Sequence, residues 1–132
     1  MKYVLDASVA ASLRPNEPHH RAAVAYLSPL LKGLDSIVVP SIFRVEVASA
    51  LARAGFTGAQ VARFVNGFLA QATVVSLGPK RTQGIQAVAV ATRLRAADAI
   101  YVWVAAAERI PLVTLDQEVH QRAAARCRVL AP

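Results

Sequence analysis

The acidic residues of this chain are few and unevenly placed. Only eight Asp and Glu residues occur among 132 residues, against 15 Lys and Arg. Half of the acids either follow apolar runs that predict strands or stand on apolar helix faces, and these are Asp6, Glu46, Asp98 and Asp116. An ionised carboxylate among apolar neighbours needs a hydrogen-bond donor, a cation or a raised pKa. The other four, Glu17, Asp35, Glu108 and Glu118, are interpreted as surface charges.

Four carboxylates that meet at one place repel one another, and only a cation or protonation relieves the repulsion. Oxygen ligands without cysteine or well-spaced histidine favour a hard ion, Mg2+ or Mn2+. A hard ion held by carboxylates, with positions open for water and phosphate, is a recurrent arrangement for phosphodiester hydrolysis. The acids therefore predict a Mg2+ site, in which Mn2+ can substitute, and hydrolysis by metal-activated water.

Each acid taken alone also has a structural explanation. Asp6 and Asp116 could cap the helices that follow their strands, and Asp98 could be an N-cap or a first-turn acid favoured by the helix dipole. Glu46 is expected in the middle of a helix between apolar neighbours, where no capping role exists. A functional role is therefore favoured for Glu46.

Polar and basic residues close to the acids are candidates for supporting roles. Ser8 and Thr114 each lie two residues from an acid and could orient a ligand, or could form local turns, the interpretation favoured for Ser8. Arg44, Arg93 and Arg95 precede two of the acids and could hold phosphates at the same edge. Solvated helix ends explain these arginines nearly as well.

Predicted strands and helices alternate along the chain. Strands are expected at 3–5, 37–39, 73–75, 112–115 and 128–130, and helices at 8–13, 17–32, 41–54, 58–70, 80–94 and 96–108, with a last helix ending near 125. Ser41 is the expected N-cap of the third helix. Such alternation predicts an α/β fold, formed by residues 1–132 as a single domain, with a parallel sheet covered on both faces. Carboxyl ends of parallel strands lie on one edge of a sheet, so the acids are expected there.

The composition narrows the classes of protein. A net charge of +7 points to a polyanion or an acidic partner, and nucleic acid is the commonest case. Hydrophobic residues make up 55% of the chain, which excludes intrinsic disorder. Cys127 is the only cysteine, which excludes an internal disulfide and favours a cytoplasmic location. No uncharged apolar run is long enough for a membrane span.

The acidic motifs resemble, in order and spacing, the four motifs of PIN domains, and more narrowly those of the VapC toxins of VapBC toxin–antitoxin pairs. They are Leu5-Asp6-Ala7-Ser8, the Glu46 of 44–51, the Asp98 of 95–101, and Thr114-Leu115-Asp116. The resemblance implies a PIN-like three-layer α/β/α fold with a central, mainly parallel sheet of four to five strands. It also implies a Mg2+- or Mn2+-dependent endoribonuclease, inhibited by a cognate VapB-like antitoxin and expected to form a homodimer.

Carried over by position, the resemblance makes Asp6, Asp98 and Asp116 metal ligands. It places Glu46 on the metal directly or through water, and makes Thr114 a residue that positions these ligands. Family members often have a further acid shortly after the Asp116 position, where this chain has Glu118.

Two alternatives remain open at the level of the sequence. A phosphotransfer enzyme of the receiver or haloacid-dehalogenase type also places Asp after a strand beside Mg2+, although such phosphatases require a second Asp where Ser8 stands. A non-catalytic module could bind RNA or protein and use the acids only as structure. Metal-dependent cleavage of RNA separates these possibilities.

Overall fold

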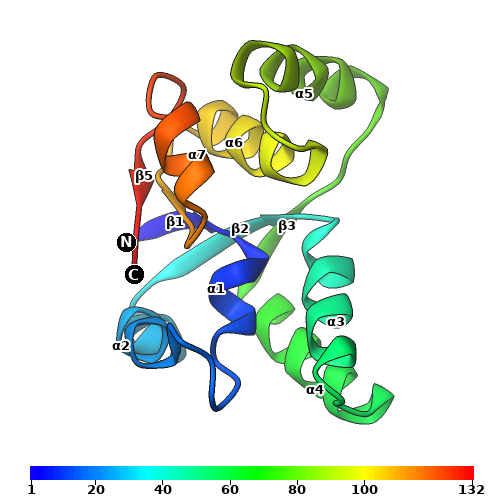
Figure 1. Cartoon of the computed structure of the whole chain (residues 1–132), viewed down its shortest axis with the longest axis vertical. Coiled ribbons are helices and arrows are strands. Elements are labelled where there is room, and N and C mark those ends of the chain that lie inside the picture. Colours follow the sequence, from blue (N-terminus) through cyan, green and yellow to red (C-terminus); the bar gives the residue numbers. More distant parts are fainter.

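The structure, a computed structural model, describes residues 1–132 and is built on five parallel strands (Figure 1). The strands are β1 (Lys2–Leu5), β2 (Ser36–Pro40), β3 (Ala72–Val75), β4 (Leu112–Val113) and β5 (Val129–Leu130). Their order in the sheet is β3-β2-β1-β4-β5, and every neighbouring pair is parallel. The predicted parallel sheet is therefore confirmed, with β1 at its centre.

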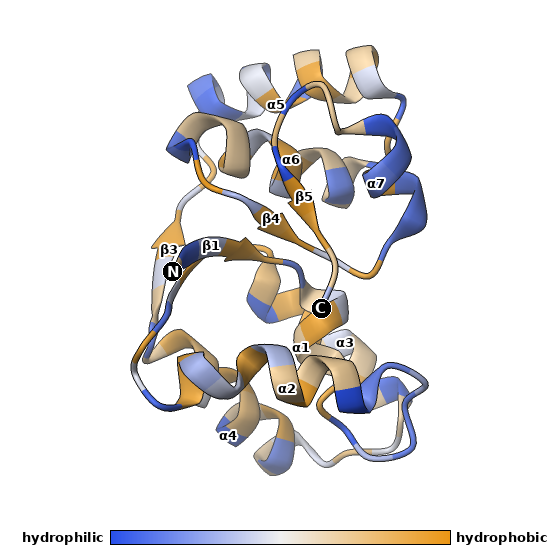
Figure 2. Cartoon of the chain, turned by 90° about the vertical axis from the view of Figure 1, so that its left-hand side faces the viewer, coloured by the Kyte–Doolittle hydropathy of each residue, from blue (hydrophilic) through white to orange (hydrophobic).

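Seven helices cover the two faces of this sheet. The helices are α1 (Ala7–Ala11), α2 (His20–Leu31), α3 (Phe43–Arg53), α4 (Gly58–Leu69), α5 (Pro79–Thr92), α6 (Ala96–Glu108) and α7 (Gln117–Arg122). Helices α1 to α4 lie on one side of the sheet and α5 to α7 on the other (Figures 1 and 2). The predicted three-layer α/β/α architecture is confirmed. None of the helices has the length and apolar character that crossing a membrane requires.

The central strand is apolar because both of its faces are covered. Tyr3, Val4 and Leu5 have no exposed surface, and they belong to one core cluster of 30 buried residues. Continuous apolar runs of this kind are typical of strands in parallel sheets. Val4 pairs with Val38 of β2 on one side and with Leu112 of β4 on the other. This register brings the ends of β1 and β4 side by side.

Two helix starts differ from the sequence prediction. Ser41 is not the N-cap of α3, because its backbone N–H donates to the Val75 carbonyl at the end of β3. Ile42 takes the cap position and makes no side-chain capping bond. Helix α2 begins at His20 rather than at residue 17. Glu17 precedes Pro18, and helical backbone is disfavoured for a residue that comes directly before a proline.

The close packing of α5 against α6 generates a stability prediction. A Cβ added at Gly84 would lie 2.5 Å from Nε1 of the half-buried Trp103 ring. We expect Gly84→Ala to lower the free energy of unfolding by about 1–3 kcal/mol, because a rigid ring has to move. Urea denaturation measures this change.

Gly67 provides the matched control for that substitution. It lies inside α4, and no atom stands within 4 Å of an added Cβ. Gly67→Ala should therefore stabilise the protein by up to about 1 kcal/mol through helix propensity. Equal effects at both glycines would contradict the packing argument.

Candidate active site in an acidic cavity

The four predicted acids come from four different elements and line one cavity of about 230 Å3. Asp6 directly follows β1, and Asp116 comes three residues after the end of β4. Glu46 lies in the first turn of α3, and not in the middle of that helix as predicted, because the helix begins at Phe43. Asp98 lies in the first turn of α6. The parallel sheet thus brings these carboxylates together at its carboxyl edge.

Asp6 is the most buried of the four, with 7% of its surface exposed. Its Oδ2 accepts hydrogen bonds from Ser8 Oγ at 2.7 Å and from Thr114 Oγ1 at 2.5 Å. Its Oδ1 accepts from the Ser8 backbone N–H, so Asp6 also caps α1. Burial raises the pKa of Asp6, the bonds from Thr114 and Ser8 act in the opposite direction, and the Asp116 charge raises it further.

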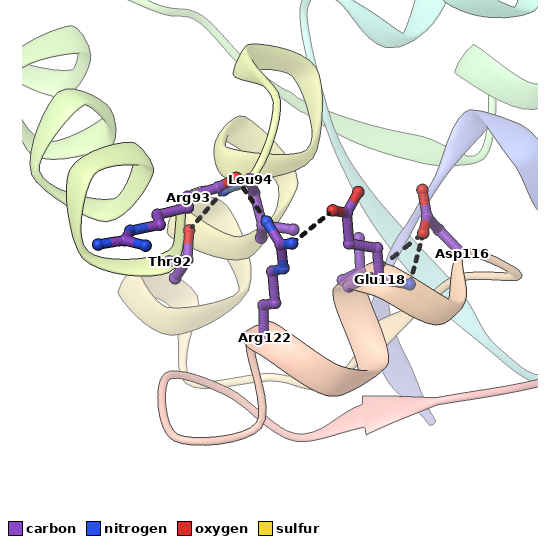
Figure 3. Close-up of polar contacts among 7 residues, drawn as sticks. Thr92, Arg93, Leu94, Asp116, Glu118 and Arg122 are labelled. Carbon is purple, nitrogen blue, oxygen red and sulfur yellow. Dashed lines mark hydrogen bonds and ion pairs between the residues drawn. The ribbon is translucent and has the colours of Figure 1, made fainter.

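Asp116 likewise combines a capping role with a place in the cavity. Its Oδ1 accepts from the backbone N–H groups of Glu118 at 2.8 Å and Val119 at 3.4 Å, which caps α7. The other carboxylate oxygen makes no hydrogen bond with the chain and points away from α7 (Figure 3). The Asp116 backbone N–H donates to Thr114 Oγ1 at 3.1 Å, so the Thr114 hydroxyl connects Asp6 and Asp116.

Glu46 has a buried oxygen without a partner. Its Oε1 is fully buried and forms no hydrogen bond, and the same is true of the Tyr101 hydroxyl from α6. Burial raises the pKa of Glu46, the approach of the Tyr101 hydroxyl lowers it, and the charges of Asp6 and Asp98 raise it again. The Tyr101 hydroxyl is therefore a close neighbour of the Glu46 carboxyl. A buried acceptor in this position is available to a ligand.

The pKa of Asp98 shows the effect of the neighbouring negative charges. Helix α6 has Arg95 at its N-cap, so Asp98 is a first-turn acid and not a cap. Burial raises the pKa of Asp98 to about 6, together with the charges of Asp116 and Asp6, while Arg95 partly compensates. The cavity therefore holds more negative charge than its own surroundings neutralise.

The supporting residues predicted from the sequence divide into two groups. Ser8 and Thr114 both donate to Asp6, and Ser8 Oγ also accepts from the Leu115 backbone N–H at 3.4 Å, so the contacts of Ser8 extend beyond a local turn. Arg95 is close enough to lower the pKa of Asp98. Arg44 is exposed on α3 and does not line the cavity. The Arg93 side chain extends away from the acidic residues (Figure 3), and its backbone carbonyl accepts a hydrogen bond from Arg122.

Glu118 is held outside the cavity lining. It forms an ion pair with Arg122 at 3.0 Å, one turn further along α7 (Figure 3). Its charge still raises the pKa of Asp98 slightly, as the weakest of the contributions to that shift. An acid that already has a cationic partner is less available to a second cation.

Arg53 is a cavity residue that the sequence prediction missed. It lies in the last turn of α3 and lines the cavity together with the four acids. Residues seven apart on a helix, two turns along, share one face. The spacing from Glu46 to Arg53 therefore indicates that the two side chains share a helix face, although Arg53 carries no acidic group by which the site was predicted.

The donor set of the cavity consists of carboxylate oxygens, which suit a hard divalent cation. No group of three or more His, Cys, Asp or Glu side chains is arranged so as to hold a metal ion as these side chains stand. Joint ligation would require the carboxylates to move closer together. The unpartnered Glu46 oxygen and the mutual repulsion are features that a cation would satisfy.

Comparison with known proteins places the geometry in context. A family model described as PIN domain matches residues 3–125. No curated protein sequence matches the chain. Solved structures are similar over nearly the whole chain.

The crystal structure of VapBC2 from Rickettsia felis, bound to a promoter DNA fragment, contains a chain 17% identical, with 99% of this chain and 98% of that chain covered and a TM-score of 0.74. The structure of VapBC-1 from nontypeable Haemophilus influenzae gives 16% identity, coverage of 99% and 98%, and a TM-score of 0.72. PAE2754 from Pyrobaculum aerophilum gives 24% identity, coverage of 98% and 83%, and a TM-score of 0.67. At these identities the likeness concerns the fold.

The raised pKa of Asp98 generates a prediction for the metal-free protein. Asp98 has a pKa of 3.8 when unperturbed and about 6 in the folded chain, so between these values the folded state binds more protons than the unfolded state. The free energy of unfolding should therefore fall as the pH rises from about 4 to about 6. Asp98→Asn should make this decline shallower and stabilise the protein at neutral pH by about 1 kcal/mol, a value discounted for partial exposure.

Urea denaturation across this pH range in EDTA measures the effect. Glu108→Gln is the control, because Glu108 is exposed at the end of the same helix. An identical pH dependence in the wild type and in Asp98→Asn would contradict the charge crowding.

Proposed function

Because the chain belongs to the PIN domain family, we propose that it is a metal-dependent endoribonuclease and the toxin of a toxin–antitoxin pair. The observation that carries the proposal is the convergence of Asp6, Glu46, Asp98 and Asp116 on one cavity. Four of only eight acids in a chain of net charge +7 line this single site. A cavity rich in carboxylates within a basic protein suits a cation and a polyanionic substrate.

Asp6, Asp98 and Asp116 would hold Mg2+, with Mn2+ as a substitute, and Glu46 would complete the donor set directly or through water. Such an ion supplies charge neutralisation at the phosphodiester and a more acidic water. The hydrogen bonds from Ser8 and Thr114 hold the Asp6 carboxylate in one orientation. Support of this kind fixes the geometry of a ligand, and these bonds offset part of the effect of burial on the pKa of Asp6.

Glu46 is the residue that we assign to the attacking water. Its raised pKa suits proton exchange closer to neutral pH than an ordinary glutamate allows. Water attacks the phosphorus in line, so the cleavage does not use the 2'-hydroxyl as nucleophile. The products therefore carry a 5'-phosphate and a 3'-hydroxyl.

We propose that Arg95 assists with a substrate phosphate, and its exposure and its proximity to Asp98 support this. Arg44 and Arg93 stay candidates for RNA contacts further from the cavity. The net charge of +7 supports binding to RNA in general, without sequence selection.

The toxin role is supported by the similarity to chains in VapBC structures. We propose a VapB-like antitoxin as the partner, with a basic segment that reaches the acidic cavity and neutralises its carboxylates. From the similarity to chains of VapBC structures we also propose that the chain forms a homodimer. The proposed location of the pair is the cytoplasm.

The nuclease activity is tested by incubating the purified chain, free of any partner, with total RNA and Mg2+ or Mn2+. We expect discrete fragments with 5'-phosphates, and their loss in EDTA. Asp98→Asn should reduce the rate by at least about a hundredfold, because it removes one ligand of the ion. Asp35→Asn is the matched control, since Asp35 pairs with the N-terminal amine outside the cavity.

Two results would count against the assignment. Cleavage that persists in EDTA would exclude the metal-dependent mechanism. Binding of RNA without any cleavage would favour the non-catalytic module.

Metal binding is tested separately by thermal unfolding. The cation relieves the repulsion in the folded state only, so millimolar Mg2+ or Mn2+ should raise the melting temperature of the wild type by a few degrees. The shift should shrink in Asp98→Asn, whose cavity is less negative. An equal shift in both proteins would indicate nonspecific binding of the ion.

A further inference from the structure

A second pocket lies at the amino edge of the sheet, which is the opposite edge from the acidic cavity. This amino-edge pocket has a volume of about 370 Å3 and is lined by the end of α6 and by the segments that lead into β4 and β5. The two strands are parallel neighbours, and the Leu112 N–H donates to the Arg128 carbonyl at 2.9 Å. The segments that precede them therefore lie side by side, next to the end of α6 (Figure 1). No residue lines both this pocket and the acidic cavity.

Three arginines line the amino-edge pocket, and these are Arg109, Arg126 and Arg128. All three are exposed, and none of them forms an ion pair or donates a side-chain hydrogen bond. Side chains of other arginines, by contrast, donate to backbone carbonyls, namely those of Arg14, Arg81 and Arg122. The guanidinium groups of the pocket are therefore free to bind a ligand.

No carboxylate of the chain neutralises this group of charges. Glu108 directly precedes Arg109, but it is exposed, does not line the pocket and forms no ion pair. Asp35 lies in the same region as Arg128, since burial and the Asp35 charge raise the pKa of Tyr26 and the Arg128 charge lowers it. Asp35 is already paired with the N-terminal amine at 2.7 Å. Three like charges around one pocket repel one another, and an anion would relieve that repulsion.

The rest of the lining of the amino-edge pocket is apolar. Ala105 is buried, and Ile110, Pro111 and Cys127 are half-buried. The volume of the pocket lies within the range of small-molecule sites, which is about 300–1,000 Å3. An apolar lining with a few convergent charged groups is also typical of such sites. The pocket therefore suits a small anionic molecule that has an uncharged part.

The number of guanidinium groups narrows the kind of anion. A planar guanidinium binds phosphate oxygens through two parallel hydrogen bonds. One phosphate monoester carries about 1.5 to 2 negative charges at pH 7, which leaves part of the charge of three arginines unmatched. A diphosphate offers two phosphoryl groups in succession, with more charge and more acceptor oxygens. A carboxylate carries a single charge and matches the three arginines less well.

We propose that the amino-edge pocket binds a small molecule that carries a diphosphate group, such as a nucleoside diphosphate. The three arginines hold the phosphoryl oxygens, and the organic part of the molecule lies against Ile110 and Pro111. The site requires none of the four cavity acids and no metal ion, so it is independent of the proposed function. Inorganic pyrophosphate has the same diphosphate group without an organic part, and the experiment distinguishes these two sources.

Isothermal titration calorimetry of the purified chain in EDTA measures binding without any metal-bridged contact to the acidic cavity. The probes are ADP, AMP, inorganic pyrophosphate and inorganic phosphate. We expect ADP to bind at a single site, and AMP and inorganic phosphate to bind at least about tenfold more weakly, because each loses charge-assisted hydrogen bonds.

The order of affinities decides between the parts of the proposal. Tighter binding of ADP than of pyrophosphate would support the contact with the organic part, and the reverse order would overturn that contact. Equal binding of ADP and AMP would overturn the role of the diphosphate group. Absence of ADP binding would overturn the site.

Arg109 offers a substitution that removes a guanidinium without straining the backbone. It is the C-cap of α6 and has a φ of 56°, in the left-handed region that favours glycine. Arg109→Gly should therefore fold at least as stably as the wild type, which its melting temperature checks. The same variant should bind ADP at least about tenfold more weakly, because it loses charge-assisted hydrogen bonds.

Arg93→Gly is the matched control for this substitution. Arg93 is the C-cap of α5, has the same φ of 56° and lies outside the amino-edge pocket. Its replacement removes the same charge from the same kind of backbone position, so the affinity for ADP should stay close to that of the wild type. An equal loss of affinity in both glycine variants would show that net charge determines binding, and would overturn the proposal.

Two further variants separate this site from the acidic cavity. Arg128→Gln should weaken ADP binding as Arg109→Gly does, because both side chains line the pocket. Asp98→Asn should not weaken it, because Asp98 lines only the acidic cavity. Loss of ADP binding in Asp98→Asn, with the arginine variants unaffected, would place the ligand in the acidic cavity and overturn the proposal.

ADP binding and RNA cleavage can fail separately. A protein that binds ADP through Arg109 but cleaves no RNA would support the site and refute the nuclease. Active cleavage without any ADP binding would overturn the site and leave the nuclease in place. Weaker binding of RNA by Arg109→Gly, in a protein that does not bind ADP, would indicate a surface for a polyanion and would also overturn the proposal.

Discussion

The hydrogen bond from Thr114 to Asp6 is the interaction on which the acidic cavity depends. It joins the residue after β1 to the residue after β4, and it forms only because the two strands are parallel neighbours in register. The same hydroxyl accepts the backbone N–H of Asp116. One buried side chain therefore holds the Asp6 carboxylate and the backbone of Asp116, which are 110 residues apart in sequence (116 minus 6). Substitution of the hydroxyl would disturb both acids together.

The acids of the cavity lie close together although their negative charges repel one another. Raised pKa values at Asp6, Glu46 and Asp98 mean that the folded chain disfavours their ionised forms. The apolar sheet and the helices around it hold these groups together regardless, because 30 buried residues form a single continuous core. Such local destabilisation is typical of functional sites, where charge is arranged for a ligand rather than for folding. The Glu46 oxygen without a partner fits the same interpretation.

The sequence predicted the sheet and the meeting of the acids for one physical reason. Strands buried on both faces are apolar throughout, and an acid that ends such a strand must lie at the carboxyl edge. Capping and cavity roles were weighed as alternatives for Asp6 and Asp116, but a carboxylate has two oxygens and can serve both. Ser41 was assigned wrongly as a cap because its hydrogen bond to β3 is a tertiary contact. Arg53 was missed although its helical spacing was visible, while the direction of the Arg93 side chain required the structure.

The proposed function requires a basic protein to act on RNA through an acidic cavity, and the distribution of charge is compatible with this. A net charge of +7 attracts a polyanion over a distance of about one Debye length, roughly 8–10 Å at physiological ionic strength. At the cavity the sign reverses, and the carboxylates repel any phosphate that arrives without a cation. Two arginines lie close to this cavity, because Arg53 is part of its lining and Arg95 is near Asp98. Attraction at long range and repulsion at short range would make entry of a scissile phosphate conditional on a cation, so under the proposed function the protein would bind RNA broadly and cut it only when the carboxylates are neutralised.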